Sequence, residues 1–123
     1  MRIAAIAQAL EGGRVDEADR QLATPCATHP DHPEVLRLHA GTLSQRGRYR
    51  EAVLACRRAL QLRPDDPLQH NTYGTVLAEA GQYDDAIAAL RRCCELQPGY
   101  AVAYYNLGVL LARCVGHDGA TAP

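Results

Sequence analysis

A stretch of 34 residues occurs twice in succession in this chain. Residues 33–66 read PEVLRLHAGTLSQRGRYREAVLACRRALQLRPDD, and residues 67–100 read PLQHNTYGTVLAEAGQYDDAIAALRRCCELQPGY. Glycine, tyrosine, alanine and proline recur one period apart, as Gly47 and Gly81, Tyr49 and Tyr83, Ala52 and Ala86, and Pro64 and Pro98. A fixed period of this size predicts stacked supersecondary units.

Each period contains two amphipathic segments that are separated by a glycine and closed by a proline. We expect helices at about Pro33–Gln45, Tyr49–Leu62, Leu68–Glu79 and Tyr83–Leu96. A turn glycine can adopt positive φ at a helix end, and proline cannot continue a helix. A small residue in the middle of each first helix allows close helix packing, at Ala40, Gly74 and Gly108.

The first 32 residues fit the same period less well. We expect one helix at about Arg2–Glu11 and a second that starts near Val15 or Asp16. Pro25 falls inside this second helix, where it removes a hydrogen bond and clashes with the preceding turn. The helix is therefore expected to end early, or to kink, near Ala23–Thr24.

The C-terminal part matches only the first helix of a fourth unit, at residues 101–115, and residues 117–123 are predicted to be a disordered tail. This helix carries a single charge, Arg113, so one apolar face should be exposed, with Leu110 on it. An exposed apolar patch usually marks an interface. Three explanations stay open: the chain is a fragment of a longer protein, it self-associates through this helix, or the tail folds back. The expected core positions of the helix are Tyr104, Leu107, Gly108 and Leu111.

The repeated residues resemble the tetratricopeptide repeat (TPR) family, most strongly over residues 33–100. The resemblance implies an all-α solenoid of helix-turn-helix repeats in a right-handed superhelical stack. A single domain would then span residues 1–116. Its repeats would lie at about 1–32, 33–66 and 67–100, with a closing helix at 101–115.

The composition argues against several classes of partner. The formal net charge is −1, so no strong attraction to nucleic acid or to an anionic membrane is expected. No apolar run approaches the roughly 18 residues that a bilayer-spanning helix needs. The five cysteines are odd in number and lack a disulfide spacing, which is typical of a reducing compartment. We expect a bacterial protein of the cytoplasm.

Motifs for catalysis or metal binding are missing from the sequence. There is no HExxH, nucleophile elbow, P-loop or GxGxxG. Cys93 and Cys94 would point about 100° apart on a helix, and no CxxC pair accompanies them, so a zinc site is not expected. The cysteines are interpreted as small core residues, and His39 as a buried histidine at a core position. We expect no catalysis, cofactor or metal.

In the TPR family, the first helices line an inner, concave surface. The resemblance implies that the partner-binding residues are Arg37, Gly41, Ser44, Asn71, Thr75, Glu79, Tyr105, Asn106, Val109 and Arg113. The two asparagines could hydrogen-bond a peptide backbone, and the two arginines could pair with a carboxylate. The alternative is a solvated polar face. The Lys–Asn–Arg clamp by which some TPR domains hold chaperone tails is not present at the matching positions.

The function expected from this resemblance is a protein–protein interaction scaffold or adaptor. It would bind a partner peptide or helix in the concave groove, without catalysis. The first alternative is the N-terminal TPR module of a larger bacterial enzyme of glycosyltransferase, sulfotransferase or oxygenase type. The second is a self-association module that forms a homodimer through helix 101–115.

Overall fold

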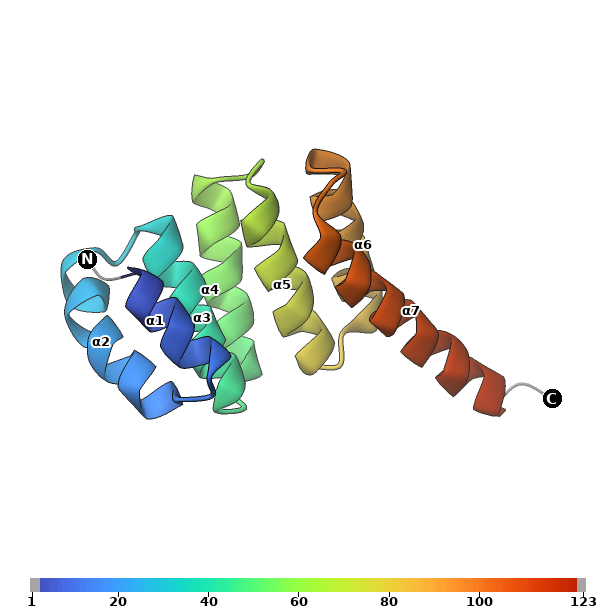
Figure 1. Cartoon of the computed structure of the whole chain (residues 1–123), viewed down its shortest axis with the longest axis horizontal. Helices are drawn as coiled ribbons and strands as arrows, with labels where there is room; N and C mark the ends of the chain where they lie inside the picture. Colours follow the sequence, from blue (N-terminus) through green and yellow to red (C-terminus); the bar gives the residue numbers. More distant parts are fainter. Residues whose placement is uncertain (1–2, 122–123) are drawn as a thin grey trace. The chain divides into compact units, whose positions relative to one another are not determined.

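The structure, a computed structural model, describes residues 3–121 and the side chains of residues 3–114. This part of the chain is all-α, as predicted, with seven helices and no strand (Figure 1). The helices are α1 (Ile3–Glu11), α2 (Val15–Thr28), α3 (Pro33–Gln45), α4 (Tyr49–Leu62), α5 (Pro67–Glu79), α6 (Tyr83–Leu96) and α7 (Ala101–Thr121). They form two compact units: unit 1, Met1–Asp65, contains α1–α4, and unit 2, Asp66–Pro123, contains α5–α7.

The 34-residue period predicts the helix boundaries of the two clear repeats closely. Helices α3, α4 and α6 begin and end at the expected residues, and α5 begins one residue earlier, at Pro67. Gly47 and Gly81 have φ angles of 78° and 83°, the left-handed conformation expected of a turn glycine. The boundary between the units lies one residue before the predicted boundary between the second and third repeats. The single domain over residues 1–116 stays a prediction.

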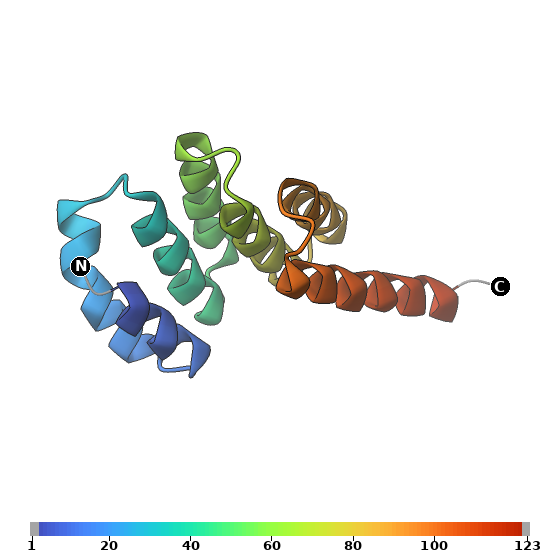
Figure 2. The ribbon, with the colours of Figure 1, turned by 45° about the horizontal axis from the view of Figure 1, so that its top comes forward.

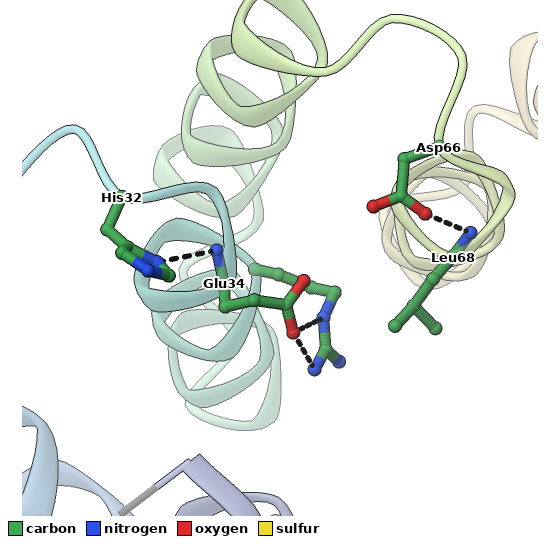
Figure 3. Close-up of polar contacts among 5 residues, drawn as sticks. His32, Glu34, Asp66 and Leu68 are labelled. Carbon is green, nitrogen blue, oxygen red and sulfur yellow. Dashed lines mark hydrogen bonds and ion pairs between the residues drawn. The ribbon is translucent and has the colours of Figure 1, made fainter. Parts of the chain in front are cut away.

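The two clear repeats also begin with equivalent N-caps (Figure 3). Nδ1 of His32 accepts a hydrogen bond from the backbone N–H of Glu34 at 3.2 Å. Oδ1 of Asp66 accepts one from the backbone N–H of Leu68 at 3.0 Å. A proline follows each cap, at a position where the missing N–H would have no helical partner. His32 therefore has a structural role at the start of α3.

The expectation that α2 ends before Pro25 is wrong, because the helix continues through this residue to Thr28. The Thr28 hydroxyl donates to the Thr24 carbonyl at 2.9 Å, and the His29 N–H donates to the Pro25 carbonyl at 2.7 Å. Cys26 packs against the core of unit 1. Pro25 lies close to the end of the helix, so few helical bonds depend on it, and these contacts hold the last turn.

Unit 1 is built around an apolar cluster to which α1, α2 and α3 all contribute. Its buried members are Ile6, Ala9, Ala18, Leu22, Val35 and Leu38. Polar contacts tie the C-terminal end of α3 to its neighbours. Nε2 of Gln45 donates to the Leu10 carbonyl at 2.9 Å, and Arg46 pairs with Asp16 and Asp19 of α2 at 2.6 Å each. The end of α3 is thereby fixed to both preceding helices.

In unit 2, α5 and α6 form a helical hairpin, and α7 packs against α6 and, over a smaller area, against α5 (Figures 1 and 2). The hairpin is tightest at Gly74. A Cβ atom at this position would lie 2.7 Å from Cγ of Leu90 and 3.2 Å from the Ala86 carbonyl oxygen. Between α6 and α7 lies a second buried cluster, made of Cys93, Cys94 and Ala103 with Tyr100 and Leu107 against it.

Helix α7 is longer than the sequence predicts. Its backbone is helical to Thr121 and does not end at Val115, so the disorder predicted for 117–123 is not found as far as Thr121. Residues 122–123 lie outside the described part. Gly116 and Gly119 disfavour a helix by about 1 kcal/mol each but do not break it, and residues 99–122 contain no proline.

The burial pattern of α7 also differs from the prediction. Tyr104 and Gly108 were expected in the core, but both are exposed, Tyr104 by 48%. Leu110 was expected on an exposed face, but it is only 4% exposed. Leu110 faces the α5–α6 hairpin, whereas Tyr104 and Gly108 lie on the side that a second helix covers in the preceding repeats. No helix follows α7 in the residues that the structure describes.

Candidate functional site

A cavity of about 290 Å³ lies between the three helices of unit 2. Its lining residues are Thr75, Ala78 and Glu79 of α5, Leu90 of α6, and Tyr105, Asn106, Val109, Leu110 and Arg113 of α7. The wall combines apolar and aromatic side chains with an amide and two charged groups. This mixture is typical of a site that buries an apolar group and orients it by a few polar contacts.

The 34-residue period explains why α5 and α7 present matching faces to this cavity. Thr75 and Glu79 are four residues apart on α5, so they lie on one face of the helix. Val109 and Arg113 repeat this spacing on α7, each 34 residues after its α5 counterpart. The two first helices of unit 2 thus contribute equivalent positions to the cavity lining.

A hydrogen bond links the α5 and α7 sides of the cavity. Nδ2 of Asn106 donates to Oδ1 of Asn71 at 3.2 Å, which links α7 to α5. The Thr75 hydroxyl donates to the Asn71 backbone carbonyl at 2.9 Å. The two asparagines were expected to bind a peptide backbone, and here they bind each other. The hydrogen bond between the two asparagines does not involve Nδ2 of Asn71 or Oδ1 of Asn106.

The mouth of the cavity exposes both apolar and charged groups. Tyr105 is 71% exposed and Val109 is 45% exposed. Arg113 is exposed and has no ion-pair partner among the side chains of residues 3–114. Glu79 is exposed on the opposite wall. A ligand that reaches this mouth therefore meets an aromatic ring, an aliphatic side chain and a guanidinium group.

Three of the predicted site residues lie in unit 1, on α3, where packing contacts occupy them. Arg37 forms a 2.8 Å ion pair with Glu34, and their side chains are only 16% and 21% exposed. A Cβ atom at Gly41 would lie 3.1 Å from Cδ1 of Leu10, so α1 covers this part of α3. Ser44 is 5% exposed. Contacts within unit 1 therefore leave these positions little open surface, and their role in partner binding stays a prediction.

Three cavity residues lie outside the predicted set: Ala78, Leu90 and Leu110. Leu90 belongs to a second helix, and Leu110 was assigned to an exposed face. The available signal for Leu90 was its spacing, because it lies four residues after Ala86 on the apolar face of α6. Six of the ten predicted residues line the cavity, and Asn71 is held against one of them.

The other ionisable groups do not form a second chemical site. A cavity of about 210 Å³ in unit 1 is lined by Cys26, Pro30, Val35, Leu36 and His39. Burial, reinforced by the nearby Asp19 carboxylate, raises the pKa of the Cys26 thiol, so it is protonated at neutral pH. Among the described residues, no group of three His, Cys, Asp or Glu could hold a metal ion. None of the helices described is both long and apolar enough to cross a membrane.

Models of known protein families match the sequence over most of its length. A family model described as "TPR repeat" matches residues 74–113. A model described as "Anaphase-promoting complex, cyclosome, subunit 3" matches residues 18–93, which is more than half of the chain. A search of curated proteins gives no significant match.

Solved structures with the same fold include proteins of very different length. A mutant O-GlcNAc transferase of Thermobaculum terrenum matches with a TM-score of 0.74 and 30% identity over 90% of this chain, which spans only 23% of the enzyme chain. The first TPR domain of human RPAP3 matches with a TM-score of 0.80 and 16% identity, covering 95% of this chain and 92% of that one. The first TPR of Spaghetti (RPAP3), bound to the HSP90 peptide SRMEEVD, gives a TM-score of 0.75 at 17% identity, covering 91% and 89%. The last two likenesses show the fold alone. With family models that together span residues 18–113, and helices that follow a 34-residue period, the chain belongs to the tetratricopeptide repeat family.

Proposed function

We propose that this chain is a protein-interaction module that binds a partner peptide, extended or helical, in the cavity of unit 2, without catalysis of its own. The observation that carries the proposal is the lining of the cavity, where exposed apolar side chains surround a buried leucine pair beside an arginine. The TPR of Spaghetti, which shares this fold, was solved with a peptide bound. That precedent supports a peptide as the class of ligand.

The lining favours a peptide with an apolar side chain next to a carboxylate. The apolar side chain would pack between Leu90, Val109 and Leu110, where burial from water stabilises it. Tyr105 would cover it from the mouth, because a tyrosine buries a large area and loses little side-chain entropy. Arg113 would pair with the carboxylate, since guanidinium and carboxylate groups form strong charge-assisted hydrogen bonds.

Two adjacent tyrosines provide a matched test of this proposal. Tyr105 lines the cavity, while Tyr104 is exposed outside it. We would select peptides from a random display library on the wild-type chain and measure their affinities for both variants by calorimetry. Tyr105→Ala should weaken binding at least about tenfold, as expected for a tyrosine at the centre of an interface. Tyr104→Ala should leave the affinity unchanged.

Two results would contradict the proposal. One is a set of selected peptides that bind both tyrosine variants as tightly as the wild type. The other is a Val109→Glu variant that keeps full affinity, because a carboxylate at this position would place a charge inside the apolar wall. Circular dichroism spectra that match the wild type would show that neither variant loses the fold.

A second candidate function follows from the likeness to the O-GlcNAc transferase. We infer that the chain can also serve as the repeat module of a larger enzyme of this type, in which the cavity binds a segment of the protein substrate. Determining the complete reading frame in the source genome tests this. A frame that encodes a glycosyltransferase domain supports the idea, and one that encodes only these repeats excludes it.

A further inference from the structure

The 34-residue period identifies another surface on α7, away from the cavity. It consists of Tyr104, Gly108 and Leu111, which we call the Gly108 face. These residues correspond to positions 70, 74 and 77 of α5, one period earlier. In α5, Gly74 lies against Leu90 and Ala86 of α6. The comparison therefore shows which contact the same position of α7 lacks.

The two helices differ in burial on this side. In α5, Leu77 is 0% exposed and Gly74 is in close contact with Leu90. In α7, Tyr104 is 48% exposed, and no described atom lies within 4 Å of a Cβ built at Gly108. At two positions on another side, burial is the same in both helices. The equivalent pairs there are Gln69 with Ala103, at 2% and 0% exposed, and Val76 with Leu110, at 3% and 4%.

The second helices of the chain share a sequence pattern, and in α6 this pattern packs against the α5 position that is equivalent to Gly108. Each presents an alanine and, four residues later, a larger apolar residue, so both lie on one side of the helix. The pairs are Ala18 and Leu22 in α2, Ala52 and Cys56 in α4, and Ala86 and Leu90 in α6, none more than 2% exposed. In α6 this pair lies directly against Gly74. At Gly108 no described atom fills the equivalent opening.

We propose that the Gly108 face binds an amphipathic helix that presents alanine and leucine four residues apart, as α6 does to α5. The glycine admits the leucine side chain, and Tyr104 and Leu111 flank it. The Gly108 face lies one period after the part of α5 that packs against α6 in unit 2, so it is the equivalent surface on the next first helix. This continuity defines the partner's chemistry. The binding differs from that in the cavity, because it uses another side of α7 and a helix with no need for a carboxylate.

The probe for this proposal is a synthetic peptide of residues 82–97 of the chain itself, with alanine in place of both cysteines. It carries Ala86 and Leu90 at the required spacing. A free peptide of this length is only marginally helical in water, so binding should raise the helical signal in circular dichroism. Calorimetry should show one peptide per chain, and a peptide with Leu90→Glu should not bind.

Three protein variants locate the binding. Gly108→Leu fills the opening and should weaken binding at least about tenfold. It should keep the wild-type helical content, because the side chain enters open space. Tyr104→Ala should also weaken binding, whereas Tyr105→Ala should not. The two tyrosine variants thus give the reverse of the pattern expected for the cavity, so that failure of one proposal does not imply failure of the other.

Several results would overturn the inference. If Gly108→Leu binds the peptide as well as the wild type, the peptide replaces α6 or binds elsewhere. Absence of binding at about 1 mM peptide would mean that the face has no useful affinity for such a helix. Self-association of the chain in sedimentation equilibrium, if Gly108→Leu abolishes it, would make a second copy the occupant.

Discussion

Gly74→Ala should destabilise unit 2, and Gly108→Ala should not, although the two glycines are equivalent in the repeat. Alanine is favoured over glycine in a helix interior by about 1 kcal/mol, and this gain applies at both positions. At Gly108 nothing opposes it, because no described atom lies within 4 Å of the added Cβ. We expect Gly108→Ala to raise the free energy of unfolding by about 0.5–1 kcal/mol.

At Gly74 the added Cβ would lie 2.7 Å from Cγ and 2.9 Å from Cδ2 of Leu90, and 3.2 Å from the Ala86 carbonyl oxygen. The closest contact involves the branch carbon of Leu90, so rotating a terminal methyl group does not relieve it. Overpacking of this kind costs about 1–3 kcal/mol, and contacts with a branch carbon and a backbone oxygen argue for the upper half of that range. After the gain in helix propensity, we expect a net loss of about 1–2 kcal/mol.

Urea unfolding followed by circular dichroism measures both changes. The two variants should differ by roughly 2 kcal/mol, and Gly74→Leu should lose at least about 2 kcal/mol relative to the wild type. A Gly74→Ala protein as stable as the wild type would refute the reasoning, since it would mean that α5 and α6 do not approach as closely as described. A loss in Gly108→Ala equal to that in Gly74→Ala would show that a helix also covers the Gly108 face.

Three further predictions concern the caps, a buried thiol and a known TPR ligand. Asp66→Ala should lower the free energy of unfolding by about 1 kcal/mol, because it removes an N-cap. His32→Asp, which introduces the stronger cap residue, should raise it by a few tenths of a kcal/mol. Urea titration tests both, and variants as stable as the wild type would contradict the role of the caps. Burial raises the pKa of the Cys56 thiol to about 12 from its ordinary 9.0. The folded state therefore keeps a proton that the unfolded state releases, so this residue's contribution to stability is full below pH 9 and is lost as the pH rises toward 12. Ellman's reagent at pH 8 should spare Cys56 in the native protein, and a rate equal to that of half-buried Cys114 would contradict its burial. The peptide SRMEEVD should bind weakly at best, because the chain lacks the clamp residues, and micromolar affinity in calorimetry would disprove this.

The sequence alone determined the helices and turns, because their signals are local. The spacing of apolar residues sets the helical faces, and glycine and proline mark the ends, so α3, α4 and α6 were predicted to the residue. The period also indicated which residues of α5 and α7 occupy equivalent positions, and six of the predicted site residues line the cavity as a result. Pro25 was misjudged because its local preference is opposed by tertiary contacts of Cys26.

Burial was decided only by the tertiary structure. Arg37, Gly41 and Ser44 have the pattern of an open surface, but α1 and an ion pair occupy the first two, and Ser44 is buried. Gly74 and Gly108 are the clearest case, because the period makes them equivalent while one is enclosed and the other open. A repeat defines which side of a helix is apolar. Whether that side is covered depends on the element that packs against it, and this is a property of the neighbouring helix and not of the residue.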